Sequence, residues 1–155
     1  MGVEIERKFL VRSDLWRSEA SEGVEIKQGY LMAAADWTLR VRIMPTRAFL
    51  TLKGATTGIR RREYEMEIPL DEARELWSDC LCSVEKKRYG VRVGEAFWEV
   101  DVFSGENAGL VVAEIELPEE EASFEKPMWL GEEVSLDARY FNACLAQQPV
   151  SSWDK

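Results

Sequence analysis

The chain has 155 residues, of which 46% are hydrophobic and 32% charged, and its formal net charge is −9. This length and composition predict one globular domain over residues 1–155. The acidic balance argues against nucleic acid or an anionic membrane as the main partner, because both bind basic surfaces. An anionic small molecule could still be a ligand if local basic clusters or a bound metal offset the overall negative charge.

The start of the chain argues against a targeting segment. Glu4, Glu6, Arg7 and Lys8 stand where a signal peptide needs apolar residues. The sequence also has no apolar run of about 18 residues, the length that a membrane-spanning helix requires. We therefore expect a cytoplasmic protein with no membrane partner.

The rare residue types restrict the chemistry. Cys80, Cys82 and Cys144 are odd in number and lack paired spacing, so we interpret them as reduced and uninvolved. The sequence has no histidine, which excludes Ser/His/Asp and Cys/His catalysis and any His-ligated metal. Catalysis would have to use carboxylates, Lys, Arg, Tyr or a metal bound through oxygen.

The first half of the chain predicts mainly strands. A strand begins with Glu4-Ile5-Glu6-Arg7-Lys8, in which Glu4, Glu6 and Lys8 share one face. A short helix over 14–19 follows, with Ser13 as its cap and with Leu15 and Trp16 facing the core. Further extended segments are predicted at 28–31, 39–43, 49–53 and 63–68, with a turn over 54–58.

The second half mixes helices with strands. Apolar residues at helical spacing after Pro69 predict an amphipathic helix over 70–80. A short acid-rich helix is expected at 119–121, and Ser135 is expected to cap a last helix that ends at Leu145. Strands are predicted at 84–89, 97–102 and 112–117, and residues 147–155 are predicted to be a frayed tail.

Seven of the predicted strands carry charges at alternate positions, nearly uniform in sign within each strand, with mostly apolar residues on the other face. A solvated sheet face usually mixes signs, so these rows indicate a shared interior surface. We therefore predict an α+β fold in which about eight antiparallel strands close into a barrel, with flanking helices and a charged tunnel. The rows are Glu4/Glu6, Arg40/Arg42, Lys53, Glu63/Glu65, Lys86/Arg88, Glu99/Asp101 and Glu114/Glu116.

Rows of like charge inside a barrel need bound ligands of the opposite charge. Like charges repel by about 4 kcal/mol per pair at about 4 Å for an effective dielectric near 20. The acidic rows suit Mg²⁺ or Mn²⁺, because hard cations take oxygen ligands. The basic rows suit a compact polyanion; with Lys8 included, they comprise Lys8, Arg40, Arg42, Lys53, Lys86 and Arg88.

Motifs over nearly the whole chain resemble the CYTH domain, or triphosphate tunnel metalloenzyme, family. The family's leading E-x-E-x-K signature stands here as Glu4-Ile5-Glu6-Arg7-Lys8. The other matching pieces follow in the family's order: Gln28-Gly29-Tyr30, Leu39-Arg40-Val41-Arg42, Thr51-Leu52-Lys53, Glu63-Tyr64-Glu65, residues 84–89, residues 99–103, Glu114-Ile115-Glu116, residues 131–134 and residues 137–142. Phe141 and Ala143-Cys144 depart from it, where more polar residues are expected.

The resemblance is strongest to bacterial inorganic triphosphatases. It implies hydrolysis of tripolyphosphate to diphosphate and phosphate with Mg²⁺ or Mn²⁺. Tyr30 is implied as a catalytic partner of Lys8 at the reacting phosphate, or else is a packing tyrosine. The implied phosphate ligands are Lys8, Arg40, Arg42, Lys53, Lys86 and Arg88, and the implied metal ligands are Glu4, Glu6, Asp101, Glu114 and Glu116, with Glu63 and Glu65 binding or orienting a second metal and its water.

Three alternatives stay open. The same fold serves class IV adenylyl cyclases and thiamine or nucleoside triphosphatases, so the fold does not decide the substrate. A module that binds polyphosphate without turnover belongs to another class. The intact acidic rows argue against that module, because simple anion capture needs no carboxylates in the pocket. A homodimer is compatible with the sequence.

Overall fold

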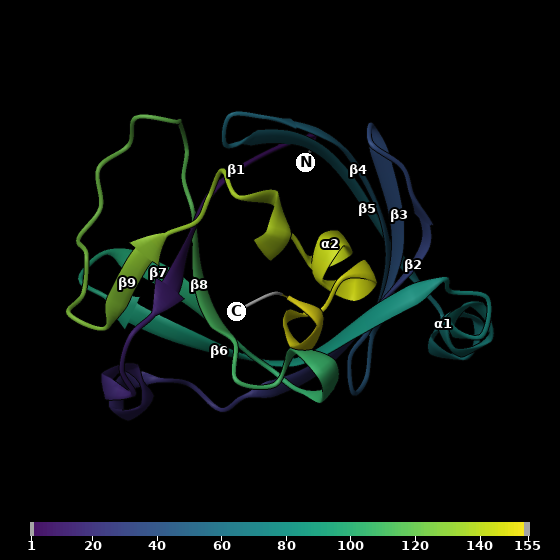
Figure 1. Cartoon of the computed structure of the whole chain (residues 1–155), viewed down its shortest axis with the longest axis horizontal. Coiled ribbons are helices and arrows are strands. Elements are labelled where there is room, and N and C mark those ends of the chain that lie inside the picture. The colour runs from purple at the N-terminus through teal and green to yellow at the C-terminus, as the bar shows by residue number, and fades with distance from the viewer. Residues whose placement is uncertain (1, 154–155) are drawn as a thin grey trace.

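The computed structural model describes residues 2–153. Its strands form one antiparallel sheet in the order β5-β4-β3-β2-β6-β7-β8-β1-β9, and β5 also pairs with β1. That extra pairing closes eight of the strands into a barrel (Figure 1), which confirms the predicted fold. The strands are β1 (Gly2–Val11), β2 (Val24–Ala33), β3 (Trp37–Ile43), β4 (Ala48–Thr57), β5 (Arg60–Ile68), β6 (Cys82–Val93), β7 (Ala96–Phe103), β8 (Val111–Glu116) and β9 (Leu130–Glu133).

Strand β1 closes the barrel by pairing with two strands in succession. Its first part, Gly2–Ile5, pairs with the start of β5, and its second part, Glu6–Leu10, pairs with β8. The short strand β9 adds to the end of β1. The sequence analysis missed β9, because two of its four residues are acidic and it has no apolar alternation.

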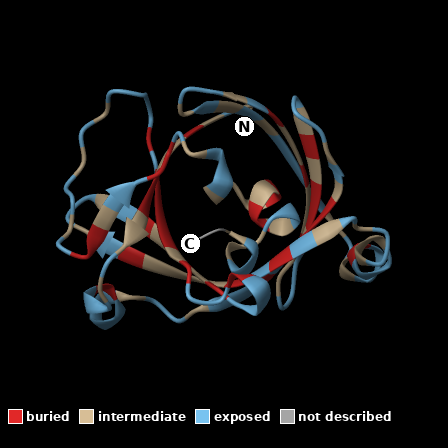
Figure 2. Ribbon diagram, viewed as in Figure 1, coloured by how far each residue is buried: buried red, intermediate tan, exposed pale blue. Residues whose placement is uncertain are grey.

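Much of the hydrophobic core lies outside the barrel wall, between the strands and the segments that cover them. Figure 2 marks the buried positions along the strands of the wall. Phe9, Trp98 and Trp129 belong to the largest apolar cluster, and the indole ring of Trp98 meets the rings of Phe9 and Trp129 edge to face. On another part of the wall, helix α1 (Leu70–Trp77) packs with Val41 and Ala48 of β3 and β4. Alternation therefore leaves the charged side of these strands for the interior.

The C-terminal segment enters the ring of strands (Figure 1). It contains η3 (Ala138–Tyr140), α2 (Asn142–Gln147) and η4 (Val150–Ser152). Leu145 of α2 is fully buried in a cluster with Val84 and Val112, two strand residues that face the interior. This apolar cluster fills one part of the barrel interior, and the part lined by charged side chains remains open.

Several local predictions were wrong. Residues 54–57 belong to β4, and the turn comes at Gly58, whose φ of 62° suits glycine. Residues 119–121 form no helix, because three consecutive exposed glutamates offer no apolar face. Ser135 caps no helix and instead accepts a hydrogen bond from the backbone N–H of Lys8 at 2.9 Å.

The helix ends and the tail also differ from the predictions. In η1 (Leu15–Glu19) Trp16 is buried as expected, but Leu15 is 61% exposed, and Ser13 precedes the N-cap residue Asp14. Helix α1 ends at Trp77 rather than at residue 80. The tail is not frayed through Trp153, whose ring packs 5.2 Å from that of Tyr140. Residues 154–155 lie outside the described residues.

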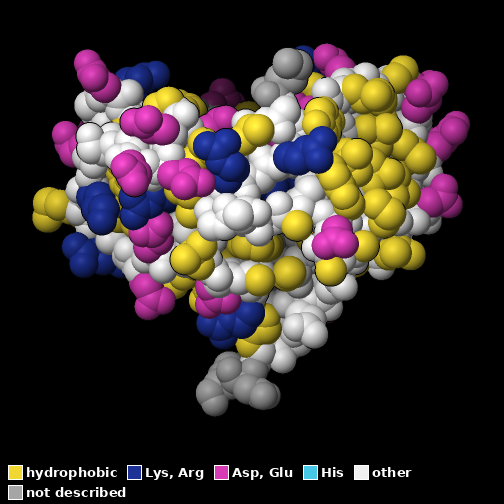
Figure 3. Space-filling view, turned by 90° about the horizontal axis from the view of Figure 1, so that it is seen from above, with side chains coloured by type: hydrophobic (Ala, Val, Ile, Leu, Met, Phe, Trp, Pro, Cys, Tyr) yellow, Lys and Arg dark blue, Asp and Glu magenta, His cyan; other side chains and the backbone are white. Residues whose placement is uncertain are grey.

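The outer surface contrasts with the interior. Figure 3 shows acidic and basic side chains intermingled on one face, beside a broad apolar area. Within residues 2–153, no helix has the length and apolar character that crossing a membrane requires.

Candidate active site

Two adjacent chambers lie inside the barrel. The first, of about 50 Å³, is lined by Lys8 and Tyr30, and the second, of about 220 Å³, by residues that include Arg42 and Glu114. They adjoin, since Glu4, Glu6, Arg40, Lys53 and Asn142 line both. The second chamber also brings together Glu63, Glu65, Lys86, Arg88, Glu99 and Glu116.

Strand register explains why the charged rows meet. In antiparallel pairs, residues directly opposite each other point to the same face. Lys8 lies opposite Glu114, Lys53 opposite Glu63, and Arg88 opposite Asp101. The alternation within each strand is thereby carried around the barrel, and the rows line a common interior.

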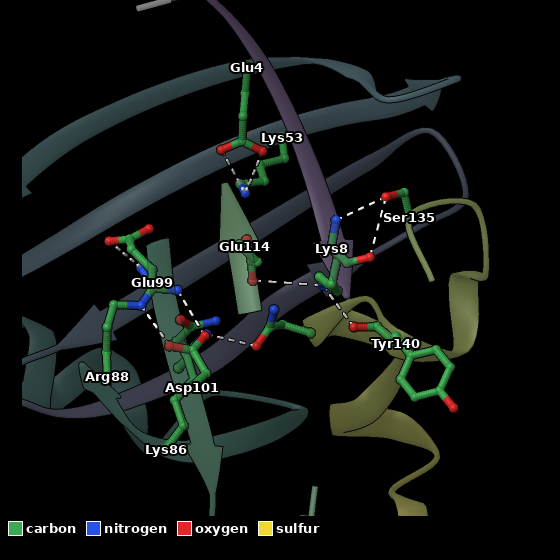
Figure 4. A network of polar contacts seen from close by, with 12 residues as sticks. Glu4, Lys8, Lys53, Lys86, Arg88, Glu99, Asp101, Glu114, Ser135 and Tyr140 are labelled. Carbon is green, nitrogen blue, oxygen red and sulfur yellow. Dashed lines mark hydrogen bonds and ion pairs between the residues drawn. The ribbon is translucent and has the colours of Figure 1, made fainter. Parts of the chain in front are cut away.

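Lys53 and Lys8 are the paired cations of the first chamber (Figure 4). The Lys53 ammonium group lies 3.1 Å from a Glu4 oxygen and 3.2 Å from a Glu63 oxygen. The Lys8 ammonium group lies 3.9 Å from Glu114 and donates to the carbonyl oxygen of Tyr140 at 2.9 Å. The C-terminal segment therefore helps to fix the position of Lys8.

Asp101 sits behind the second chamber rather than in its lining. Its fully buried carboxylate accepts two hydrogen bonds from Arg88, at 2.7 and 2.9 Å, and lies 2.8 Å from the Lys86 ammonium group. Burial alone would raise the pKa of Asp101, but Arg88 and Lys86 outweigh it and hold that pKa far below its usual range. This differs from the metal-ligand role predicted for Asp101, because its oxygens are engaged by cations.

Arg40 and Arg42 carry positive charge without a carboxylate partner. Neither guanidinium forms an ion pair in the described part of the chain, and the buried Nε of Arg40 has no hydrogen-bond acceptor there. Arg42 donates only to the neutral Oε1 of Gln28, at 2.8 and 3.1 Å. Burial and the charges of Arg40 and Arg88 lower the pKa of Arg42 to about 9. Buried charge is costly unless it is paired, so this corner favours an anion.

Several carboxylates of the site, in contrast, have too little positive charge near them. Burial, followed by repulsion from Glu114 and Glu4, raises the pKa of Glu6 well above its usual value. Burial likewise raises the pKa values of Glu4 and Glu99, although Lys53 and Arg88 oppose it. For Glu114, Lys8 and Arg88 outweigh burial and lower the pKa to about 2. Crowded, buried carboxylates of this kind favour a cation.

These donors fit Mg²⁺ or Mn²⁺. They are all oxygen atoms, and Oε1 of Glu114 is buried without a hydrogen-bond partner. Between residues 2 and 153, no three acidic or cysteine side chains gather closely enough to hold a metal by themselves. Mg²⁺ is usually held by one or two carboxylates, with water and substrate phosphates completing its shell.

Other side chains at the site escaped the sequence analysis or were given no role there. Alternation with Asp101 places Glu99 on the interior face, but the sequence analysis gave it no ligand role, although it lines the second chamber. Asn142 begins helix α2 and accepts from Lys86 through its Oδ1 at 2.9 Å, and Ser135 lies in an irregular segment, so neither position has a periodic signal. Tyr30 is 2% exposed and its hydroxyl lies 3.4 Å from the Gln28 amide nitrogen.

Comparison with known proteins agrees with this geometry. The family described as the CYTH domain matches residues 2–142. The chain belongs to the CYTH domain family. Two curated CYTH relatives are both named inorganic triphosphatase. The one from Acetivibrio thermocellus is 48% identical over 156 residues, covering 99% of both chains, and the one from Nitrosomonas europaea is 39% identical over 149 residues, covering 93% of this chain and 97% of its own.

Solved structures extend the comparison. A crystal structure of an inorganic triphosphatase is 38% identical, with a TM-score of 0.69, and the match covers 92% of this chain and 97% of the other. A Hippeastrum protein, described as a putative adenylyl cyclase with a dominant triphosphatase activity, has a TM-score of 0.61 at 17% identity, with coverage of 78% and 81%. That second likeness shows the fold alone.

Proposed function

We propose that this CYTH protein hydrolyses inorganic tripolyphosphate to diphosphate and phosphate with the help of a divalent cation. One observation carries the proposal: uncompensated guanidinium groups and crowded carboxylates face adjoining chambers. A metal–polyphosphate complex supplies both missing charges at once. The names of the relatives at 48% and 39% identity support the same activity.

The residues divide between the two ligands. Arg40, Arg42 and Lys53 hold phosphate oxygens, together with Lys8, Lys86 and Arg88. Glu4, Glu6, Glu114 and Glu116 supply the carboxylates for Mg²⁺ or Mn²⁺, with water and phosphate oxygens completing its shell, and Glu63 and Glu65 serve a second ion. When bound, the metal neutralises phosphate charge and acidifies a water molecule for attack on phosphorus. In phosphoryl transfer the protein's main contributions are position and electrostatics, for which this site needs no histidine.

Two further roles follow from the contacts. Asp101 orients Lys86 and Arg88 rather than a metal, because its oxygens bind both cations. Tyr30 lines the first chamber with Lys8, and we assign it to orienting a phosphate there.

Attack by water breaks one P–O–P bridge, and the bridging oxygen leaves with the diphosphate.

The lining favours a bare phosphate chain over a nucleotide. Apart from Asn142, every residue that lines the second chamber is charged. Phosphates find partners there, whereas a base or a thiazolium ring finds no apolar surface in that chamber. The first chamber, which Tyr30, Ile59 and Phe141 also line, has a volume of only about 50 Å³. We therefore place inorganic tripolyphosphate ahead of ATP and thiamine triphosphate.

A phosphate-release screen tests the proposal. Tripolyphosphate, ATP, thiamine triphosphate and longer polyphosphate are each incubated with Mg²⁺ or Mn²⁺, and cyclic AMP is assayed in parallel. Tripolyphosphate should be cleaved much faster than the others, and excess chelator should stop the reaction. Equal rates with ATP, or cyclic AMP formation, would favour the other enzymes of this fold, and binding without turnover would favour a polyphosphate-binding module.

A further inference from the structure

The β4–β5 hairpin contains a bulge beside the first chamber. Lys53 lies opposite Glu63, and Thr56 lies opposite Arg61. Two β4 residues, Gly54 and Ala55, therefore face one β5 residue between these pairs. Such bulges bend a strand and re-aim side chains, and they are frequent beside active sites.

The bulge fixes the direction of Arg61. The Arg61 Nε donates to the carbonyl oxygen of Gly54 at 2.6 Å. Arg61 stands two positions before Glu63, so it points to the interior, where it lines the first chamber with Lys8, Arg40 and Lys53. The ring of Phe141 lies 5.9 Å from the Arg61 guanidinium carbon and 5.7 Å from the Lys8 ammonium nitrogen.

Arg61 is oriented without being neutralised. Its Nε is occupied by a neutral carbonyl, and no carboxylate lies within 4.0 Å of its guanidinium in the described chain. Arg42 is held in the same manner by the neutral Gln28. A guanidinium that is fixed by one nitrogen keeps its other donors for a planar, anionic partner.

The charges of the two chambers differ. The first is lined by four basic side chains, Lys8, Arg40, Lys53 and Arg61, and by two acidic ones, Glu4 and Glu6. Acidic side chains outnumber basic ones in the second chamber. Metal-bound phosphates therefore belong to the second chamber, and the end of the chain farther from the metal belongs to the first.

We propose that Arg61 is a further phosphate-binding residue, which binds the end of the phosphate chain in the first chamber and thereby distinguishes triphosphate from diphosphate. This inference rests on the proposed function. Diphosphate would occupy the carboxylate-rich second chamber, where the metal is expected, and would not reach Arg61. The binding energy from Arg61 is present before and during reaction, so its loss should raise KM and leave kcat nearly unchanged.

The test compares Arg61→Ala and Arg61→Lys with Arg62→Ala. Arg62 is the adjacent arginine on the other face, where it stacks on Trp37 and Tyr64. Loss of a charge-assisted hydrogen bond should raise KM for tripolyphosphate by about tenfold to a hundredfold in Arg61→Ala. Arg61→Lys should be intermediate and Arg62→Ala unchanged, and inhibition by diphosphate should stay the same in all three. An unchanged KM, a fall in kcat alone, or an equal loss of diphosphate inhibition would each overturn the role.

A binding experiment separates this inference from the proposed function. Tripolyphosphate should raise the Tm of a Glu6→Gln protein, in which turnover is stopped, and adding Arg61→Ala should remove most of that rise. If the wild-type chain releases no phosphate but this pattern holds, the proposed function fails and Arg61 stands as a binding residue. If tripolyphosphate is hydrolysed and Arg61→Ala behaves as wild type, only the Arg61 role fails. If Arg61→Ala does not fold, Arg61→Gln, which keeps a donor near Gly54, is measured in its place, and an unchanged KM or Tm rise in that variant overturns the role.

Discussion

The ammonium group of Lys86 lies 2.8 Å from the carboxylate of Asp101, and neither side chain is more than 1% exposed. The same carboxylate also binds Arg88. We predict that Asp101→Asn lowers the free energy of unfolding by about 3–5 kcal/mol, because it leaves buried Lys86 without its counter-ion and Arg88 with Glu99 alone. Urea denaturation measures the change.

An exposed ion pair supplies the control for that prediction. Glu120 pairs with Arg60 on the surface, where both side chains are about half exposed. Glu120→Gln should therefore change stability by less than about 1 kcal/mol. Similar losses in the two variants would contradict the role given to Asp101.

Glu6→Gln should abolish turnover and leave the fold intact or more stable. The substitution removes one anionic oxygen from the metal site, and it also removes the buried charge and the repulsion from Glu114 and Glu4 that together raise the pKa of Glu6. Phosphate release and thermal melting are measured on the same sample. Full activity in this variant, or full activity of the wild-type protein in excess chelator, would contradict the metal-dependent mechanism.

Arg40→Ala should affect the empty and the ligand-bound protein in opposite ways. Its buried, unpaired charge beside Arg42 disfavours the empty state. The variant is therefore expected to melt at a higher temperature when empty, and Arg40→Met repeats the test without creating a cavity. Tripolyphosphate should stabilise the Glu6→Gln protein by about 2.7 kcal/mol at a hundredfold excess over Kd, and Arg40→Ala should reduce that gain.

A surface substitution completes the Arg40 experiment. Glu120→Ala should alter neither the melting of the empty protein nor its response to tripolyphosphate. A lower melting temperature for empty Arg40→Ala, combined with an undiminished response, would show that this guanidinium does not serve the ligand.

The Arg7–Glu133 pair predicts a pH-dependent contribution to stability. Arg7 Nε donates to Glu133 at 2.8 Å, and this hydrogen bond lowers the pKa of Glu133 below 4.5. A lowered pKa stabilises the fold above the unfolded value, and that stability disappears as the pH falls through the folded value. Glu133→Gln should cost about 0.5–1 kcal/mol at pH 7, after allowance for partial exposure, and progressively less as the pH falls below 4.5 toward 3.

Denaturation of both proteins at the two pH values measures this difference. Asp14→Asn, in a pair whose carboxylate is 83% exposed, is the control and should show no difference at either pH. A constant gap between wild type and Glu133→Gln across this range would mean that the carboxylate acts through packing rather than charge.

The barrel could be predicted from the sequence because its strands alternate strictly. Rows such as Arg40/Arg42 and Glu114/Glu116 identify an interior face by charge alone. Asn142 and Ser135 could not be found in that way, because their positions depend on tertiary packing rather than on a local repeat. The role of Asp101 also required coordinates, since a carboxylate that binds a metal and one that binds two cations look the same in sequence. The homodimer and the cytoplasmic location stay predictions.

Arg61 shows a different limit. In the Arg60-Arg61-Arg62 run, alternation with Glu63 places Arg61 on the interior face. The bulge at Gly54 shifts the register of β4 by one residue relative to β5. The sequence does not indicate this bulge, the contact between Arg61 and the Gly54 carbonyl oxygen, or the chamber that Arg61 shares with Lys8.

The contacts between Lys8 and the C-terminal segment also determine the stage of chain synthesis at which the site becomes complete. Lys8 is held by Ser135 and Tyr140, which lie 127 and 132 positions later in the chain, and Lys86 is held by Asn142. Domains generally fold as units while synthesis proceeds from the N-terminus. A nascent chain that has emerged only as far as Glu116 already contains every carboxylate of the chambers, yet it lacks the groups that orient two of the lysines. The site as it stands in the structure is therefore complete only after the C-terminal segment has been synthesised and has entered the barrel.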